Sequence, residues 1–224
     1  SHQQPLGHVL SLERRFALLQ AAEQAGAWIV EDDYDGEFFF GRRPLPTLKS
    51  VDRTGLVIYV GTFSKSLFPA LRLGFMLVPG ELVEVFRTVA AAFVQGVPTS
   101  VQAGVAEFIE EGHFATHIRR MRRIYEERHA ALIAAAGRHL AGALEVMPTD
   151  SGLHTIARLA PGLSETAVAA TADRHRVTVS PIARFSIEPT PERGLVLGFG
   201  GVPPAAIRTG VEALARAIEE VTRP

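Results

Sequence analysis

Two short apolar runs in this chain are each followed at once by reactive side chains. Trp28–Val30 precedes the acidic stretch Glu31–Glu37, and Leu56–Val60 precedes Gly61–Ser66, which holds one lysine among several hydroxyls. Apolar runs of this length are typical of buried strands in a parallel sheet. Ligands of open α/β sheets bind beyond the carboxyl ends of the strands. We therefore expect an amine, a carboxylate, a phenol and a group of hydroxyls to meet at one edge of the sheet.

The first half of the chain has the pattern of one layer of an α/β fold. Ser11 can cap a helix that Gly26 ends, and a third apolar strand is expected over Leu71–Val78. Residues 41–54 hold two prolines and four basic residues, which predicts a polar surface loop. Three apolar strands separated by a helix or a loop favour an α/β layer with a mainly parallel sheet.

The second half is first helical and then mixed. A long helix is expected over residues 113–140. The elements expected after it are strands at 153–159, 177–182 and 195–199 and helices at 164–174 and 203–221. We therefore predict part of a large domain in residues 1–112, a linking helix in 113–140 and a small α+β domain in 141–224.

Composition narrows the class of protein. A formal charge of −1 gives no electrostatic footprint for nucleic acid or an anionic membrane. No apolar run approaches the ~20 residues that a membrane span needs. Without cysteine there are no disulfides or thiolate metal sites, and the cytoplasm is the expected location. The start Ser1–Pro5 lacks both a signal-peptide pattern and an initiator methionine, so we expect it to lie within a longer chain.

The acidic stretch can hold a heteroaromatic ring. Side chains alternate along a strand, so Asp32 and Tyr34 are expected on one face and Asp33 on the other. A carboxylate can keep a pyridine nitrogen protonated, which makes the ring an electron sink. The phenol can bond a neighbouring ring hydroxyl.

The lysine segment suits an aldehyde and a phosphate. Lys65 can form a Schiff base with an aldehyde if its pKa is lowered by burial or by nearby cations. Thr62, Ser64 and Arg72 can hold phosphate oxygens, since the arginine fork binds two oxygens at once. The complementary ligand is a cofactor with an aldehyde, a pyridine nitrogen and a phosphate.

Taken singly, these segments leave other interpretations open. Residues 31–37 can also be a divalent-metal site or a solvated acidic turn. Gly61–Ser66 superficially resembles a P-loop, but it lacks the glycine before the lysine and the four-residue gap. The eight histidines show no metal-ligand spacing.

Taken together, the segments resemble the C-terminal part of a fold-type-I aminotransferase, in the pyridoxal 5'-phosphate (PLP) superfamily. More narrowly, the chain resembles the effector-binding domain of MocR-type regulators of the GntR family, which join a winged helix-turn-helix DNA-binding domain to an aminotransferase-like domain. The segments that carry the resemblance are Ser1–Gln3 with Pro5 and Gly7, Glu31–Phe38, Gly61–Leu67, Leu71–Phe75 and Gly152–His154. The resemblance implies a fold-type-I PLP-dependent transferase-like α/β fold, with residues 1–112 as the C-terminal part of the PLP-binding large domain.

The resemblance also assigns roles to individual residues. Lys65 would be the Schiff-base lysine, Asp32 the partner of the pyridinium nitrogen and Tyr34 the donor to the ring hydroxyl. Thr62, Ser64 and Arg72 would be the phosphate ligands. An arginine of the small domain should bind an amino-acid carboxylate; Arg184 is our choice, with Arg158 and Arg193 as weaker candidates.

For function, the resemblance implies a PLP-binding domain of a transcriptional regulator that senses an amino acid or amine. It implies a homodimer that contacts DNA only through a domain absent from this chain. The N-terminal half of the large domain would also be absent, so apolar faces should be left uncovered. The first alternative is a true class I/II aminotransferase, and the second is a metal-binding protein that uses the acidic cluster 31–37.

Overall fold

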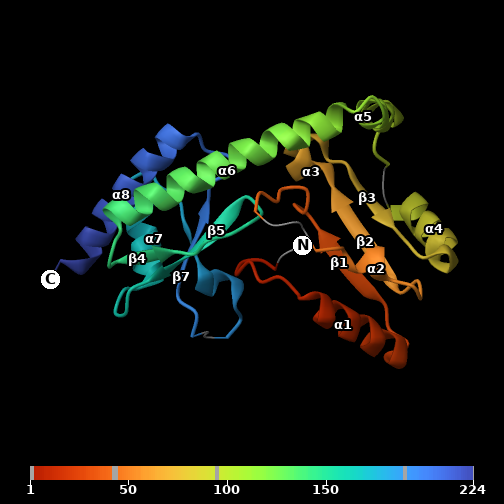
Figure 1. Ribbon diagram of the computed structural model, residues 1–224, viewed down its shortest axis with the longest axis horizontal. Helices are drawn as coiled ribbons and strands as arrows, with labels where there is room; N and C mark the ends of the chain where they lie inside the picture. Colours follow the sequence, from red (N-terminus) through yellow and green to blue (C-terminus); the bar gives the residue numbers. More distant parts are fainter. Residues whose placement is uncertain (1–2, 42–44, 94–95, 189–190, 224) are drawn as a thin grey trace. The chain divides into compact units, whose positions relative to one another are not determined.

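The structure is a computed structural model in which residues 3–41, 45–93, 96–188 and 191–223 are described. The chain divides into two compact units (Figure 1). Within the described residues, the first unit comprises residues 9–37 and 45–120, and the second comprises residues 3–8, 38–41 and 121–223. The long helix α6, His113–His139, contributes to both units, because the division falls after Arg120.

The first unit is built on a three-stranded sheet with the order β1-β2-β3. Its strands are β1 (Ile29–Asp33), β2 (Val57–Thr62) and β3 (Gly74–Leu77). Strand β1 runs parallel to β2, whereas β3 runs antiparallel to it. The sheet in the described residues is therefore mixed, which corrects the expectation of a mainly parallel sheet.

The length of the connection explains the direction of β3. A parallel crossover needs a dozen or more residues and usually a full helix. Only residues 63–73 separate β2 from β3, and they form two short turns, α3 (Phe63–Ser66) and the 3-10 helix η1 (Pro69–Leu71). The chain therefore returns alongside β2 in the opposite direction.

Helix α1, Leu12–Ala25, covers one face of this sheet and has the predicted ends. The Ser11 side chain accepts a hydrogen bond from the Arg14 amide, and Gly26 closes the helix in a left-handed conformation. The apolar side chains of α1 are only partly buried. Leu19 is buried, but Phe16 is 51% exposed and Arg15 takes a buried position instead.

The predicted loop 41–54 contains a short helix, α2 (Leu48–Val51). Thr47 caps it, and the buried carboxylate of Glu31 accepts hydrogen bonds from the Leu48 and Lys49 amides. Leu48 packs in a small core with residues of α1, β1 and β2. A purely polar surface loop was therefore the wrong prediction for this segment.

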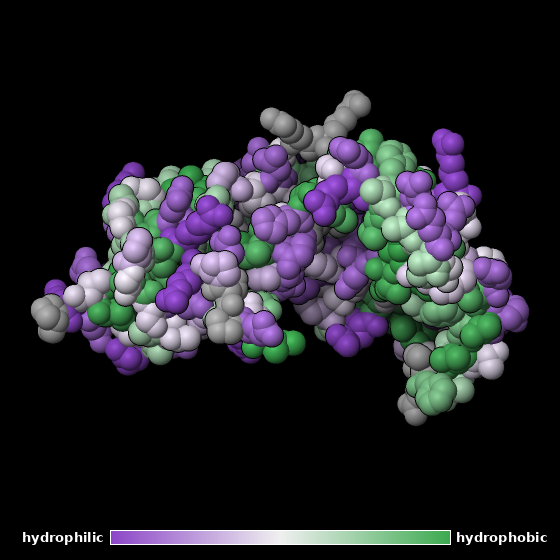
Figure 2. Space-filling view, turned by 90° about the horizontal axis from the view of Figure 1, so that it is seen from below, coloured by the Kyte–Doolittle hydropathy of each residue, from purple (hydrophilic) through white to green (hydrophobic). Residues whose placement is uncertain are grey.

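The remaining helices of the first unit leave much apolar surface exposed. They are η2 (Gly80–Leu82), α4 (Val83–Phe93), α5 (Thr99–Glu110) and the first two turns of α6. Val85, Val89 and Phe93 of α4 are 57%, 50% and 82% exposed. Figure 2 shows apolar residues gathered at the surface on the right, where this unit lies. The expectation of uncovered apolar faces agrees with this surface.

The second unit is a four-stranded antiparallel sheet with the order β4-β5-β7-β6, flanked by helices. Its strands are β4 (Leu144–Val146), β5 (His154–Leu159), β6 (Ser180–Pro181) and β7 (Gly194–Gly198). Its helices are α7 (Glu165–Arg174), η3 (Ile182–Phe185), α8 (Pro204–Thr222) and the greater part of α6. This arrangement confirms an α+β unit; β4 is the strand that the sequence did not predict.

Within the part of the chain that the structure describes, no helix is both long enough and apolar enough to cross a membrane.

Candidate functional site

The candidate site lies where β1 and β2 end side by side. The parallel register places Asp32 beside Val60 and Asp33 beside Gly61. Tyr34 then follows β1. The short helix α3, Phe63–Ser66, follows β2 and is called the lysine turn because it contains Lys65. The two motifs that the sequence singled out therefore meet at the carboxyl edge of one sheet, as expected.

The lysine turn is fixed by a set of local hydrogen bonds. Thr62 caps α3, since its hydroxyl oxygen accepts a bond from the Ser64 amide at 3.1 Å. The fully buried Ser66 donates its hydroxyl to the Thr62 carbonyl at 3.3 Å. A ring nitrogen of His117, from α6, lies 2.9 Å from the Ser66 carbonyl oxygen. These bonds hold the backbone on both sides of Lys65, whose side chain is exposed.

An aromatic ring packs so close to Gly61 that no side chain fits at this position unless the ring moves. The Phe75 side chain on β3 lies over Gly61, and a Cβ at Gly61 would come 2.4 Å from its ring. The same ring contacts Phe63 at 5.5 Å between centroids, and Phe63 in turn meets Phe114 of α6 at 5.9 Å. The lysine turn is thus packed against aromatic rings from β3 and α6.

The acidic stretch divides into buried and exposed carboxylates. Glu31 and Asp33 are buried, whereas Asp32 lies on the exposed face of β1 together with Val30. The Glu31 carboxylate is engaged by the α2 amides and by Arg15, at 3.6 Å. This alternation follows the strand periodicity.

The metal interpretation finds no support in this arrangement. Among the described residues, no group of three or more histidine, aspartate or glutamate side chains is placed to hold a metal ion. Alternating burial contributes to this result, because neighbouring carboxylates of residues 31–33 point to different faces of β1.

Two phenols, Tyr34 and Tyr59, lie near the carboxylates of the strand end. The Tyr59 hydroxyl donates to Asp33 at 2.9 Å. Burial raises the pKa of Tyr59, and the hydrogen bond to Asp33 adds to the rise. Burial also raises the pKa of Tyr34, and the carboxylates of Asp35, Asp32 and Asp33 contribute. Both phenols are therefore protonated at neutral pH and can donate hydrogen bonds.

Asp35 is a residue to which the sequence analysis gave no role. It is 1% exposed, and burial raises the pKa of its carboxyl from 3.8 to about 7. The carboxylates of Asp33 and Glu37 add to the rise, and the Lys65 ammonium opposes it. Protonated and ionised forms of this carboxyl therefore coexist near neutral pH. Its position two residues beyond Asp33 on the same strand periodicity is the signal that could have indicated its burial.

The structure distinguishes the two lysines of the chain. The Lys49 ammonium donates to the Val57 carbonyl at 2.7 Å. Lys65 is exposed at the strand edge. The amine of Lys65 is therefore the one available to a ligand.

Arg72 follows η1 in a left-handed conformation, with φ 50°, and its side chain is exposed. A non-glycine residue in this region carries strain on the order of 1 kcal/mol or more, and such strain often marks functional sites.

The three arginines considered for a carboxylate all belong to the second unit. Arg184 lies on η3 with an exposed side chain. Arg158 of β5 is 3.7 Å from the Glu192 carboxylate. Arg193, just before β7, is exposed. Arg158 is therefore partly neutralised, whereas no ion pair joins Arg184 or Arg193 to another described residue.

Comparison with known proteins identifies the class to which this fold and site belong. The sequence profile of aminotransferase class I and II matches residues 1–214. The α-aminoadipate aminotransferase LysN from Thermus thermophilus, solved with N-(5'-phosphopyridoxyl)-L-leucine, is 30% identical with a TM-score of 0.86, over 98% of this chain and 57% of that one. Kynurenine aminotransferase from Pyrococcus horikoshii is 25% identical with a TM-score of 0.89, over 99% of this chain and 55% of that one. The chain belongs to the class I and II aminotransferase family and has a fold-type-I fold.

Within that family, higher sequence identities are found with transcriptional regulators. The probable rhizopine catabolism regulatory protein MocR of Rhizobium meliloti is 42% identical over 96% of this chain and 43% of its own length. The HTH-type regulator YhdI of Bacillus subtilis is 43% identical over 96% of this chain and 46% of its own length. The chain is thus an aminotransferase-like domain homologous to MocR-type regulators, and it spans about half the length of these relatives.

Proposed function

We propose that the chain is the PLP-binding, ligand-sensing part of a transcriptional regulator, with an amino acid or amine as its effector. The observation that carries this proposal is the difference in sequence identity. The two regulators are 42% and 43% identical, whereas the 2-aminoadipate transaminase of Thermus thermophilus is 30% identical over a similar share of the chain, 98%. The regulatory relatives thus match this sequence better than the enzyme does.

The side chains at the strand edge fit PLP chemically. Lys65 is an exposed primary amine, whereas the amine of Lys49 is bonded to a backbone carbonyl. Asp32 offers an exposed carboxylate, whereas Asp33 accepts the Tyr59 hydroxyl. An amine for covalent attachment and a carboxylate for the ring nitrogen are therefore both exposed at this edge of the sheet.

The aromatic ring would be held by two side chains of the β1 end. The Asp32 carboxylate would accept a hydrogen bond from the protonated ring nitrogen, and the Tyr34 hydroxyl would donate a hydrogen bond to the ring hydroxyl. The raised pKa of Tyr34 supports this role, because the phenol remains a donor at neutral pH. When bound, PLP supplies an aldehyde that captures amines and an electron-withdrawing ring.

The phosphate would be held beside the lysine turn. The Thr62 hydroxyl oxygen accepts a hydrogen bond from the Ser64 amide. The hydrogen of the same hydroxyl can therefore be donated to a phosphate oxygen. Ser64 would add a second hydroxyl, and Arg72 a guanidinium that can bind two oxygens. The strained backbone at Arg72 supports this assignment, because strained residues cluster at sites where a side chain has to be held in position for a ligand.

The effector carboxylate would be bound by Arg184. A carboxylate removed from water needs a paired cation, and an arginine fork suits it best. The exposed side chain of Arg184 supports its choice over Arg158, which faces Glu192.

Assembly, partners and location follow from the same proposal. A homodimer would cover part of the exposed apolar surface of α4 and β3. DNA would be contacted through a separate domain, because YhdI is an HTH-type transcriptional regulator of which this chain covers 46%. The cytoplasm is the matching location.

The second candidate function is catalytic transamination. It is favoured by the structural likeness to LysN, at a TM-score of 0.86 and 30% identity. The same residues would serve both functions, so only turnover separates them.

The experiment that separates them is a titration of the PLP-loaded protein with a panel of amino acids and amines. Binding is followed by absorbance, and keto-acid product is measured in the presence of excess 2-oxo acid. A sensor binds a restricted set of ligands, and product does not exceed the amount of protein. Continuing accumulation of keto acid, lost in Lys65→Ala, would instead establish the transaminase. Failure to bind any amine would overturn both.

A further inference from the structure

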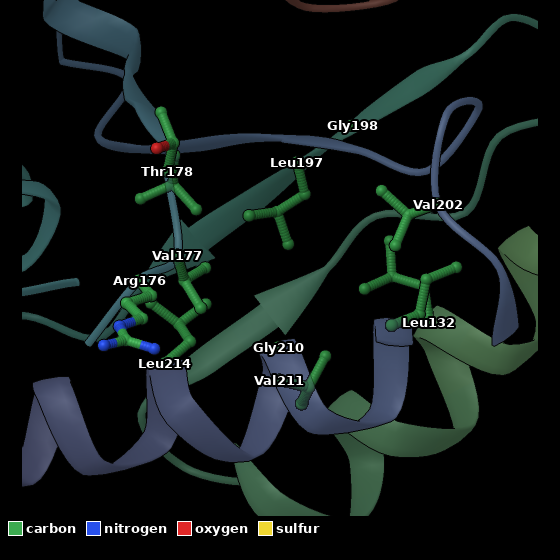
Figure 3. A pocket seen from close by; sticks show the side chains of 12 residues that line it. Leu132, Arg176, Val177, Thr178, Leu197, Gly198, Val202, Gly210, Val211 and Leu214 are labelled. Carbon is green, nitrogen blue, oxygen red and sulfur yellow. The ribbon is translucent and has the colours of Figure 1, made fainter. Parts of the chain in front are cut away.

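The second unit contains an apolar cavity of about 230 Å³, and its lining includes none of the residues assigned to PLP. It lies between strand β7, helix α8, helix α6 and the segment that leads into β6 (Figure 3). Its aliphatic walls are formed by Leu132, Val177, Val179, Leu197, Val202, Ile207, Val211 and Leu214. Figure 3 shows Leu197 and Val211 projecting into the space from opposite sides.

The cavity arises where a strand pairing ends. The ladder between β6 and β7 consists of Ser180–Val196 and Pro181–Leu195. Residues 177–179 lie outside this ladder and line the cavity on one side, while Leu197 and Gly198 line it on the other. The opening between two segments that would otherwise pair is therefore part of the backbone arrangement.

Two glycines keep the cavity open. Gly198 of β7 and Gly210 of α8 both line it, and a Cβ at either position would meet no atom within 4 Å. Glycine within a helix is less favourable than alanine. A larger residue at Gly210 would therefore favour the helix, and its side chain would take up space in the cavity.

The cavity is lined by one cationic side chain among the described residues, Arg176. Of the described residues that line it, Arg176 alone is charged. Arg174 and His175, the two residues before it, both contact the Glu220 carboxylate, at 2.7 and 3.0 Å. No hydrogen bond or ion pair joins the Arg176 guanidinium to another described residue.

The backbone at Arg176 is also unusual. Its φ is 61°, at the position just after the end of α7 where glycine is the common residue. The amides of Arg176 and Val177 close the helix through the Asp173 and Ala172 carbonyls. An arginine here bears strain that glycine would avoid, and its placement puts a guanidinium beside the aliphatic walls.

We propose that this cavity is a binding site for a small aliphatic carboxylate, with the carboxylate on Arg176 and the hydrocarbon chain between β7 and α8. The volume is equivalent to about seven or eight groups the size of a water molecule or methylene, at about 30 Å³ each. At this volume per group, a straight chain of about six to eight carbons fills the cavity. The apolar walls remove the chain from water, and the single unpaired cation selects an anionic head.

The test is calorimetric titration of the full chain with sodium octanoate, compared with octan-1-ol. Octanoate is expected to bind with a 1:1 stoichiometry and at least about ten-fold more tightly than the alcohol, since a hydrogen bond to a charged group is worth more than one to a neutral group. Arg176→Gln should bring the affinity for octanoate to the level of the alcohol. Equal affinities of the wild-type protein for acid and alcohol would overturn the assignment of the head group.

A pair of glycine variants locates the site. Gly210→Leu fills the cavity and should abolish octanoate binding. Gly137→Leu is the matched control: Gly137 is also helical, in α6, has open space at its Cβ and does not line the cavity. Both variants should unfold at or above the wild-type temperature, because each replaces a helical glycine. Octanoate binding that survives Gly210→Leu, or is lost equally in Gly137→Leu, would overturn the proposal.

Discussion

The buried carboxyl of Asp35 should make the stability of the first unit depend on pH. Burial raises its pKa from 3.8 to about 7, so the folded state holds this proton more tightly than the unfolded state does. The stability contributed by the protonated carboxyl is full below about pH 4 and is lost as the pH rises to about 7. The difference between the two pKa values corresponds to on the order of 4 kcal/mol, at about 1.4 kcal/mol per pKa unit.

Asp35→Asn removes this dependence, because an amide does not ionise. Urea unfolding of the PLP-free protein between pH 4 and 8 can be followed by Trp28, the only tryptophan of the chain and part of the first unit. The free energy of unfolding of the variant minus that of the wild type should grow by on the order of 4 kcal/mol across this range. Glu23→Gln, at an exposed carboxylate of α1, is the control and should leave the pH profile unchanged. A difference that stays constant from pH 4 to 8 would show that Asp35 does not titrate differently in the folded and unfolded states.

Three further outcomes are expected. Gly61→Ala should destabilise the apo protein by about 1 kcal/mol in urea unfolding, at the low end for overpacking because the Phe75 ring is partly exposed, and Phe75→Leu should relieve the effect. Asp32→Asn should lower PLP retention in equilibrium dialysis, whereas Asp33→Asn should mainly lower stability; equal losses of PLP in both variants would contradict the face assignment. Arg184→Ala should weaken amino-acid binding by on the order of 2–5 kcal/mol and leave PLP loading intact, and unchanged affinity would point to another arginine.

Local patterns in the sequence predicted most elements of the fold correctly. The α1 caps at Ser11 and Gly26, the long α6 and the last helix α8 all depend on near neighbours in the chain. Such signals are carried by capping residues and by periodicity, which can be read without the tertiary structure.

The features that were missed depend on contacts between distant residues. Helix α2 is held by the Glu31 carboxylate, which lies 17 residues from the Leu48 amide. Arg15 is buried because Glu31 and the Leu10 carbonyl lie beside it. In the second unit, the Arg122 guanidinium lies 3.8 Å from the centre of the Phe39 ring, a contact between residues far apart in the sequence. No local pattern encodes these partners.

The candidate site shows the same division. Strand alternation separated Asp32 from Asp33 correctly, since this follows from the periodicity of one strand. The hydrogen bond of His117 to the lysine turn joins residues 51 positions apart and could not be predicted. The roles of the site residues toward PLP remain predictions.

We propose that PLP attaches to the chain at Lys65. The most direct test is to incubate the protein with PLP, reduce it with borohydride and locate the pyridoxyl group by peptide mass spectrometry. Because the Lys49 amine donates a hydrogen bond to the Val57 carbonyl, we expect label on Lys65, none on Lys49 and none in Lys65→Ala. Label on Lys49 with Lys65 unmodified would contradict it.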